Sequence, residues 1–537
     1  MKAKKCWALI LAVLLTIGCF SACADTPAAS GAGSSTVAAG ETSTAVNTDE
    51  TDPFAETVKL SIGFWGSEKL GGDELWNDYI VPKFNVDFDY IQMDFSDYVE
   101  KVRLLAASDE LPDICVSPGR TDYFSYSEQG LLKALPDDLS DYPELEAYLD
   151  TPSLPFYYID GKLYGIPRGG GRNLNNAFAG SFYMVRKDWM EQAGYEEFPT
   201  EWEEFFTMAQ DVMALNPDGI SNLVGIAGST TEILDPMKSS LSKIGEGFQL
   251  IDGQWAPAEF NKEDNIPWLE LGRKAYQMGV IDKNFALDDA SVAKDKILAG
   301  QAFCGMLYMT AADMQSLAEQ FESANPGKSA EECIGFYLPP NGFDGKPHAI
   351  YSAVNIGTMF SAKMSDEQMD RTLRFIDWIL TDEGQTMLNL GEKDKDYTLE
   401  GETFTSLLPE NPATGKQYTY EEKYPSCIIK QLVTWGGDWA KVSPTVDKTY
   451  RDIYNDAEAY VMENATYAEY NYEVAWTKTD AMSKWNYMAD FEQGFVKIIM
   501  GTDNIGAMYD SIIEDTLAKG GKQALAELNE VLAAKTE

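Results

Sequence analysis

Residues 58–64, VKLSIGF, alternate between apolar and small or polar side chains, the two-residue period of a half-buried strand. A helical pattern follows at Tyr98, Val102 and Leu105. The apolar run at residues 114–116 then predicts a second, fully buried strand. Strand, helix and strand in this order predict an α/β lobe built on a parallel sheet.

Two capping boxes predict the starts of later helices. Thr200 with Glu203, and Ser365 with Gln368, have the spacing in which two side chains satisfy free backbone N–H groups. The second helix is expected to stop near Gly384. Apolar residues at helical spacing follow each box and are expected in the core: Trp202, Phe205, Phe206, Ala209 and Met213, then Met369, Leu373, Ile376 and Leu380.

Composition bounds the function. Hydrophobic residues make up 45% of the 537 positions, ample for a packed protein that is too long for a single core. The formal net charge is −44, which excludes nucleic acid as a partner because phosphates need a basic surface. The only histidine is His348, so multi-histidine zinc sites and relays are excluded.

The first residues have the pattern of a secretory leader. Three lysines at positions 2, 4 and 5 precede an uncharged stretch at 6–22, too short for a membrane-spanning helix. It ends in Phe20-Ser21-Ala22-Cys23, which resembles a lipobox and predicts lipidation of Cys23. Residues 16–19 form a weaker second match, and an ordinary cleaved leader is the alternative.

Residues 23–55 predict a flexible tether between that lipid and a folded domain. They are mostly Ala, Gly, Ser, Thr, Asp and Glu, which cannot bury enough apolar surface to offset the entropy of ordering. Leader and tether together predict a protein anchored by lipid at the extracellular face of the cell membrane. Beyond the leader four cysteines remain, at positions 115, 304, 333 and 427, and both disulfides and free buried thiols stay open.

Four segments together resemble one known family. The first is YSEQGLLKAL at 126–135 followed by DGKLYGIPR at 160–168, and the second is SFYMVRKDW at 181–189 followed by AGYEEFPTEWEEF at 193–205. The third is FIDWILTDEGQTMLNLG at 375–391, and the fourth is the stretch 491–518 containing FVKIIMGTDNIGAMYDSII. In this order they resemble the family 1 extracellular solute-binding proteins of ABC importers, and within these the LipO-like lipoproteins of Gram-positive bacteria. The wider group includes the maltodextrin-binding proteins.

The resemblance implies an α/β, two-lobe periplasmic-binding-protein-like fold of class II, with a ligand cleft between the lobes. Lobe 1 would comprise residues 56–175 plus 346–400, and lobe 2 residues 176–345 plus 401–537. It implies a monomer without enzymatic activity or cofactor that delivers a small solute, expected to be a carbohydrate and specifically an oligosaccharide, to the permease subunits of an ABC importer.

Some relatives carry a calcium loop between two helices of the second lobe. The corresponding residues 216–222, including Asp218, lack enough spaced oxygen ligands and the closing glutamate. We therefore predict no metal site in this chain.

Sugar pockets combine aromatic platforms with planar charged or amide groups. Such residues are expected after strands and near the crossings between lobes, where ligand loops of α/β sheets gather. The candidates are Trp65, Arg120, Asp122, Tyr123, Arg168, Arg172, Tyr308 at the end of a strand over 303–309, Tyr351, Asn355, and Trp435 and Trp439 in a glycine-containing loop.

Three other functions remain open at this level. A peptide or another organic solute could replace the carbohydrate, and a sensor subunit that presents ligand to a membrane kinase would have the same sequence features. A secreted glycoside hydrolase needs only paired carboxylates, which 86 acidic residues supply in abundance. No acid lies in a diagnostic catalytic motif, so the hydrolase is the weakest alternative.

Overall fold

The computed structural model describes residues 54–536, apart from 152–153, 170–177, 179, 242–246, 351–354, 435–436, 469–470, 472–473, 475–476 and 478. The predicted leader, with Cys23, and the tether as far as residue 53 lie outside the described residues. Within the described part, no helix combines the length and apolarity needed to cross a bilayer.

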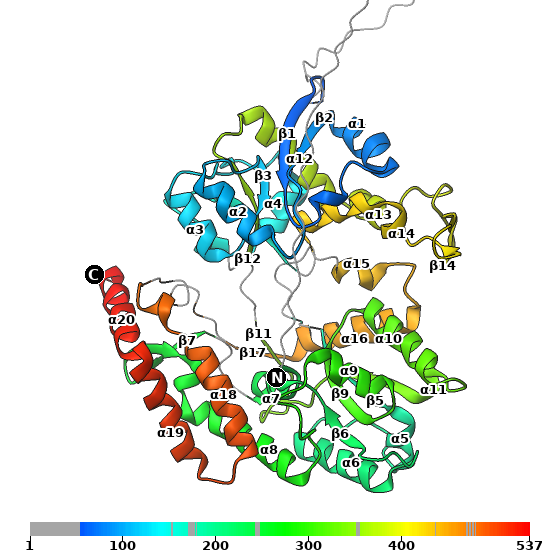
Figure 1. Ribbon diagram of the computed structural model, residues 1–537, viewed down its shortest axis with the longest axis vertical. Helices are drawn as coiled ribbons and strands as arrows, with labels where there is room; N and C mark the ends of the chain where they lie inside the picture. The colour runs from blue at the N-terminus through cyan, green and yellow to red at the C-terminus, as the bar shows by residue number, and fades with distance from the viewer. Residues whose placement is uncertain are drawn as a thin grey trace, which may run out of the picture. The chain divides into compact units, whose positions relative to one another are not determined.

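The first sheet has five strands in the order β2-β1-β3-β12-β4 (Figure 1). These strands are β1 (Val58–Gly63), β2 (Val86–Tyr90), β3 (Ile114–Val116), β4 (Gly165–Arg168) and β12 (Asn355–Phe360). β1 is parallel to β2 and β3, whereas β12 is antiparallel to both β3 and β4. The predicted strands at 58–64 and 114–116 and the helix between them, α2 (Tyr98–Ala107), are confirmed.

Helices cover this sheet and share one hydrophobic core with it. They are α1 (Val81–Phe84), α2, α3 (Arg120–Glu128), α4 (Pro143–Leu149), α12 (Asp366–Leu380), α13 (Asp382–Asn389) and α14 (Tyr420–Lys423). Apolar residues between 408 and 433 also belong to this core, and the buried Thr358 hydroxyl donates to the Leu432 carbonyl at 2.7 Å. The structure therefore differs from the sequence-based boundary at 401, because the segment 408–433 packs with the first sheet.

The second sheet has four strands in the order β10-β5-β9-β6. They are β5 (Ser181–Arg186), β6 (Val224–Ala227), β9 (Ala302–Tyr308) and β10 (Ile334–Tyr337), and β9 confirms the strand predicted over 303–309. Alternate residues of β5 enter two different cores, Tyr183 and Val185 one of them and Phe182 and Met184 the other. Both faces of this sheet are therefore buried, which explains why β5 is apolar without alternation.

Each face of the second sheet has its own helices. One core includes residues of α5 (Lys187–Gln192), α6 (Trp202–Leu215), α7 (Thr230–Leu241), α8 (Lys262–Met278), α18 (Tyr487–Met500) and α19 (Ile505–Thr516). The other includes residues of α9 (Ala290–Leu298), α10 (Ala311–Ala324), α11 (Ala330–Cys333) and α16 (Lys448–Asn464). The C-terminal α20 (Lys522–Thr536) contributes Leu528 and Leu532 to a smaller cluster.

The remaining described strands form four two-stranded sheets. They are β7 (Phe248–Ile251) with β8 (Gln254–Pro257), β13 (Tyr397–Glu400) with β14 (Thr403–Ser406), β15 (Glu410–Asn411) with β16 (Lys416–Gln417), and β11 (His348–Ile350) with β17 (Thr466–Ala468). Beside the last pair, Asp344 accepts a hydrogen bond from the Thr466 hydroxyl at 2.7 Å and lies 3.0 Å from His348 Nε2. Partial burial raises the pKa of Asp344, but these hydrogen bonds outweigh it and lower that pKa to about 2.

One predicted capping box is confirmed and the other is wrong. Ser365 and Gln368 bond reciprocally at the start of α12. At α6, however, the N-cap is Glu201, whose backbone is extended (φ −107°, ψ 135°) and whose side chain makes no capping bond. Thr200 therefore lies one residue too early to cap, and Glu203 instead forms an ion pair with Lys274 at 2.8 Å.

The predicted stop of the second helix near Gly384 is also wrong. α12 ends at Leu380, and Thr381 caps the next helix, α13, by accepting a hydrogen bond from the Gly384 N–H at 2.9 Å. A Cβ atom on Gly384 would lie 1.9 Å from the Trp378 carbonyl oxygen. This glycine is required for close packing at the junction of two helices rather than for ending one.

The four cysteines at 115, 304, 333 and 427 are free and buried. Burial raises the pKa of Cys427 to about 11 and that of Cys115 to about 12. Both thiols are therefore protonated and unreactive at neutral pH.

Candidate functional site

The carboxyl ends of three strands meet at one edge of the first sheet. Because β12 is antiparallel to its neighbours, its first residue, Asn355, pairs with Arg168, the last residue of β4. Gly63 at the end of β1 pairs with Cys115 of β3 in the same part of the sheet. Ligand loops of open α/β sheets gather at such an edge. The backbone thus brings five predicted site residues to it: Trp65, Arg120, Asp122, Arg168 and Asn355.

Trp65 lies just after β1 and is committed to protein contacts. The Arg168 guanidinium carbon is 4.0 Å from the centroid of the indole, and the indole N–H donates to Gln431 Oε1 at 2.7 Å. Tyr98 contacts the indole edge-on, with ring centroids 4.9 Å apart. Only 7% of Trp65 is exposed, so this residue packs against its neighbours at the edge and leaves little surface for a solute.

Arg168 supplies the cation of this cluster. Burial lowers the pKa of Arg168 to about 9, against the opposing influence of Tyr98 and Tyr148. The guanidinium therefore remains charged at neutral pH, and the indole beneath it contributes a cation–π interaction.

Asp122 and Arg103 form a planar, two-point ion pair at the same edge. Arg103 Nε and Nη2 on α2 donate to the two carboxylate oxygens of Asp122 on α3 at 2.9 and 3.0 Å. Hydrogen bonding to Asp122 raises the pKa of Arg103. Burial raises the pKa of the nearby Tyr98, and the charges of Arg168, Arg103 and Asp122 all act on its hydroxyl. The Tyr98 hydroxyl therefore lies among the charged groups of this edge.

Tyr123 differs from its predicted role. It is completely buried in the first core, where its hydroxyl donates to the Tyr157 carbonyl at 2.8 Å and accepts from the Tyr164 N–H at 3.1 Å. Its position on α3, one residue after Asp122, turns it inward because neighbouring helical residues point about 100° apart. No surface of this ring remains for a solute.

Two other predicted residues, Tyr308 and Trp439, belong to other elements of the described structure. Tyr308 ends β9 in the second sheet and is half exposed, pairing through its backbone with Ser181. Trp439 lies within a short helix, α15 (Gly437–Val442), and not in the loop expected from the flanking glycines. Arg172, Tyr351 and Trp435 fall outside the described residues, and so do the side chains of Arg120 and Asn355.

Sequence reasoning missed Phe95, Tyr98, Arg103 and Gln431. Tyr98 was included only in the apolar pattern of its helix, and no pattern singled out Arg103. Gln431 lies 366 positions after Trp65, so no local pattern links them. Phe95 did carry a signal: it is an aromatic residue in the turn Asp94-Phe95-Ser96 between a strand and a helix, where polar residues are usual.

The sequence profile of the bacterial extracellular solute-binding proteins matches residues 69–386, more than half of the chain. The chain belongs to this family. Lipoprotein LipO of Bacillus subtilis (strain 168) is similar, with 26% identity over 343 residues, 61% of this chain. The match spans 64% of the length of that relative.

Solved solute-binding proteins share the fold. An HMO-binding, ABC-transporter-associated protein from Bifidobacterium longum infantis matches with a TM-score of 0.61 and 12% identity, over 88% of this chain and 98% of that one. The N-glycan transport protein NgtS of Streptococcus pneumoniae matches with a TM-score of 0.57 and 15% identity, over 89% of this chain and 97% of that one. The structure of the alginate-binding protein AlgQ2 without calcium ion matches with a TM-score of 0.57 and 16% identity, over 90% of this chain and 99% of that one. The likeness confirms the two-lobe α/β fold class.

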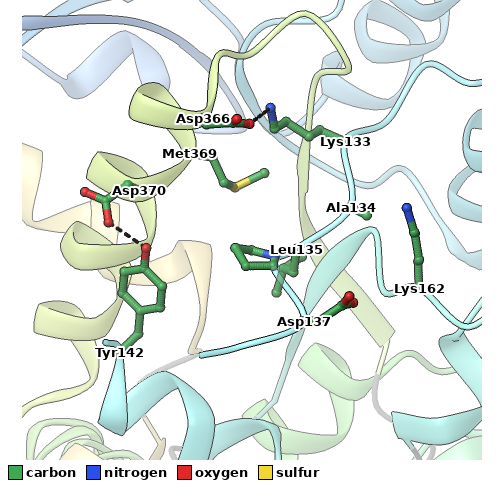
Figure 2. A pocket seen from close by; sticks show the side chains of 10 residues that line it. Lys133, Ala134, Leu135, Asp137, Tyr142, Lys162, Asp366, Met369 and Asp370 are labelled. Carbon is green, nitrogen blue, oxygen red and sulfur yellow. Dashed lines mark hydrogen bonds and ion pairs between the residues drawn. The ribbon is translucent and has the colours of Figure 1, made fainter. Parts of the chain in front are cut away.

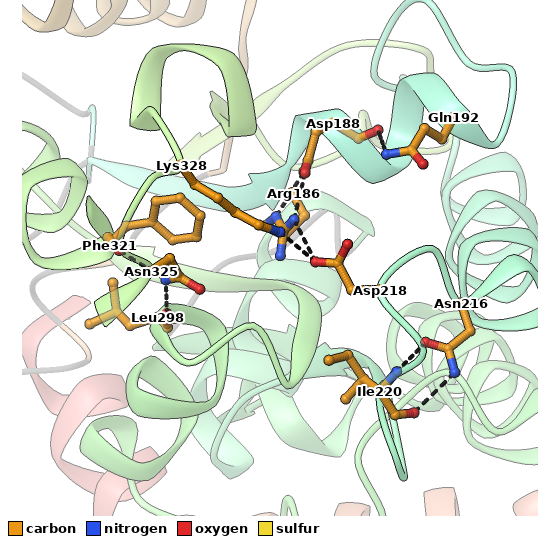
Figure 3. A network of polar contacts seen from close by, with 10 residues as sticks. All are labelled: Arg186, Asp188, Gln192, Asn216, Asp218, Ile220, Leu298, Phe321, Asn325 and Lys328. Carbon is orange, nitrogen blue, oxygen red and sulfur yellow. Dashed lines mark hydrogen bonds and ion pairs between the residues drawn. The ribbon is translucent and has the colours of Figure 1, made fainter. Parts of the chain in front are cut away.

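The loop 216–222 of this solute-binding protein does not fit a calcium ion (Figure 3). Lys328 Nζ lies 2.5 Å and Arg186 Nη2 3.3 Å from the Asp218 carboxylate. The Asn216 amide is engaged by both backbone groups of Ile220. Partial burial raises the pKa of Asp218, but hydrogen bonds from Lys328 and Arg186 outweigh it and lower that pKa. Two side-chain cations thus engage the oxygens that calcium would need.

Among the residues that the structure describes, no group of three or more His, Cys, Asp or Glu side chains could hold a metal ion.

A pocket of about 440 Å³ lies elsewhere on the first sheet (Figure 2). Lys162 precedes β4 and Asp366 follows β12, so this pocket is at the edge opposite to Trp65 and Arg168. Two of its polar contacts are internal: Lys133 pairs with Asp366 at 2.7 Å, and the Tyr142 hydroxyl donates to Asp370 at 2.7 Å. Of its lining residues only Tyr142 is aromatic, and it is buried, so this pocket lacks the aromatic platform that the carboxyl edge offers and is a weaker candidate for a sugar.

Proposed function

We propose that this extracellular solute-binding protein captures a carbohydrate, specifically an oligosaccharide, and delivers it to the permease subunits of an ABC importer. One observation carries the proposal: the aromatic rings of Trp65, Phe95 and Tyr98 contact one another at the carboxyl edge of the first sheet, and the charges of Arg103 and Asp122 act on the Tyr98 hydroxyl. Sugars present apolar ring faces and a rim of hydroxyls, and this edge offers both kinds of partner. The protein acts by binding and not by catalysis.

The predicted contacts beyond this cluster belong to the same proposal. The backbones of Arg120 and Asn355 lie at the carboxyl edge, and Tyr308 offers a half-exposed ring on the second sheet. Arg172, Tyr351, Trp435 and Trp439 complete the proposed set.

The proposed lobes follow the two sheets. Lobe 1 would comprise residues 56–175 and 346–433, and lobe 2 the remainder; the packing of segment 408–433 in the first core supports moving this boundary from 401. Solute with higher affinity for a closed arrangement of the lobes would drive closure, and the importer would bind the closed form.

We also propose that Cys23 is lipidated and anchors the protein, as a monomer, at the extracellular face of the membrane. Growth of the producing cells with a radioactive fatty acid tests this proposal. The full chain should acquire label, and Cys23→Ala should lose it. Label retained by Cys23→Ala would move the anchor to another residue.

The binding proposal is tested by thermal unfolding of the chain lacking residues 1–22, against panels of oligosaccharides and oligopeptides. A solute at about a hundred times its Kd stabilises the folded state by roughly 2.7 kcal/mol, enough to raise the midpoint by several degrees. A shift with one class of saccharide supports the proposal. Shifts with peptides alone would contradict it, and hydrolysis of a chromogenic glycoside by the pure protein would contradict the absence of catalysis.

A further inference from the structure

Three aromatic residues at the carboxyl edge differ sharply in exposure. Trp65 and Tyr98 each contact Phe95, with ring centroids 6.3 and 6.1 Å apart. Tyr98 is half-buried and Trp65 almost fully buried, whereas 74% of Phe95 is exposed. Folding therefore leaves most of the apolar surface of Phe95 in water, where it contributes little to stability.

The buried indole cannot serve as the platform for a sugar ring. The Arg168 guanidinium covers the indole of Trp65, Tyr98 packs against its edge, and Gln431 accepts from its N–H. The aromatic surface that this edge presents to a solute therefore comes mainly from Phe95 and in part from Tyr98.

The loop that carries Phe95 is fixed by hydrogen bonds on its N-terminal side. The buried Ser67 hydroxyl donates to the Ile91 carbonyl at 2.6 Å and accepts from the Met93 N–H at 3.2 Å. The Gly66 N–H donates to the Met93 carbonyl at 3.0 Å. Gly66 has a φ of 96°, a conformation that other residues rarely adopt.

A local turn fixes the other side of Phe95. Asp94 accepts hydrogen bonds from the backbone N–H and the hydroxyl of Ser96 at 2.8 and 2.6 Å. The ring is thus presented on a loop that is already ordered, and binding need not meet the entropic cost of ordering it.

We propose that Phe95 is the residue on which a sugar ring of the solute stacks, with Tyr98 beside it and the Arg103–Asp122 pair available to the sugar hydroxyls. This inference rests on the proposed carbohydrate-binding function and names the side chain that decides the apolar part of its specificity. The C–H groups on one face of a pyranose match a flat aromatic surface, whereas an extended peptide has no such face.

The test is calorimetric titration of the full chain and three variants with a saccharide that shifts its unfolding midpoint. Phe95→Ala should weaken binding at least tenfold, and Phe95→Trp should retain it within about threefold, since any flat ring preserves the stack. Phe343→Ala is the matched control, because Phe343 is also a largely exposed phenylalanine (64%) but belongs to a turn at 342–346 beside α7 and β11 and not to the first sheet. It should leave affinity unchanged.

The unfolding midpoints of all three variants should equal that of the wild type, because both phenylalanines are largely exposed. Wild-type affinity in Phe95→Ala would overturn the inference and leave the carbohydrate-binding function standing. A loss of binding in Phe95→Trp equal to that in Phe95→Ala would also overturn it. If the wild-type protein bound no saccharide, the proposed function would fall first and this inference with it.

Discussion

Arg186 holds the polar network of the second sheet, and its replacement by methionine should destabilise the fold (Figure 3). The guanidinium is completely buried at the end of β5. Its Nε and Nη2 donate to the Asp188 carboxylate at 2.7 and 2.5 Å, and Nη2 also lies 3.3 Å from Asp218. Trp189 packs beneath it, 3.8 Å from the ring centroid to the guanidinium carbon.

The loss in free energy of unfolding follows from the carboxylates of Asp188 and Asp218 that Arg186→Met would leave without this partner. Breaking a fully buried ion pair by removing one partner costs about 3–5 kcal/mol. That range is an upper limit here, because the side chains of Asp188 and Asp218 keep 21% and 35% of their exposure and water screens them. Lys328 still pairs with Asp218. Including the lost cation–π contact, we expect a loss of about 2–3 kcal/mol.

Scanning calorimetry of the wild type and Arg186→Met measures this loss. For a unit of 150–250 residues, about 2–3 kcal/mol corresponds to a fall of roughly 4–12 °C in the transition that reports the second sheet. Lys187→Met is the matched control: its Nζ contacts only the Glu331 carbonyl at 2.7 Å near the surface, so its midpoint should stay within a degree or two.

The same calorimetry is repeated with added calcium and with a chelator. Because Arg186 and Lys328 occupy Asp218, neither calcium nor a chelator should move the wild-type midpoint. An Arg186→Met variant within about 0.5 kcal/mol of the wild type would refute the stabilising role of the network. A wild-type midpoint that rises with calcium and falls with chelator would refute the view that side-chain cations exclude the metal.

Three further predictions concern stability and reactivity. Ser365→Ala should lower the free energy of unfolding by about 1 kcal/mol through loss of its cap, whereas Thr200→Ala should change it by less than about 0.5 kcal/mol; denaturant titration compares the two. The pKa of Asp344 is depressed to about 2, so the stability that its ionised carboxylate contributes is present above about pH 4 and lost as pH falls towards 2. The free energy of unfolding of Asp344→Asn should therefore depend less on pH in that window than that of the wild type, as acid titration of unfolding would measure. A thiol reagent at pH 7 should leave Cys304 unmodified in the native protein and modify it in urea, and rapid native labelling would contradict its burial.

Features set by neighbouring residues were predictable from sequence. The alternation at 58–64 reflects a strand whose Val58, Leu60 and Ile62 are buried while Lys59 is exposed. The box at Ser365 works because its partner stands three residues later. In each case the interaction that decides the structure lies within a few positions of the chain.

Features set by tertiary packing were not. Thr200 and Glu203 have the same spacing as the working box, yet the extended backbone at Glu201 delays the helix by one residue. Gly384 looks like a helix stop, but its position is dictated by the Trp378 carbonyl across a junction of two helices. The packing of residues 408–433 in the first core was not predictable for a similar reason, because their partners in the first sheet lie far away in sequence.

The candidate site shows this division most clearly. Local patterns placed Trp65 after a strand and Arg168 near a crossing between lobes, but the strand order that brings both to one edge came from the structure. Which ring meets the solute could not be predicted either, because it depends on Arg168 and Gln431 covering Trp65, and both lie more than a hundred positions from it in the chain. A tryptophan after a strand is a strong candidate for a ligand platform only if no other side chain covers its ring. Once the indole is covered, the same edge makes Phe95 the exposed ring, and the search for ligand contacts should begin there.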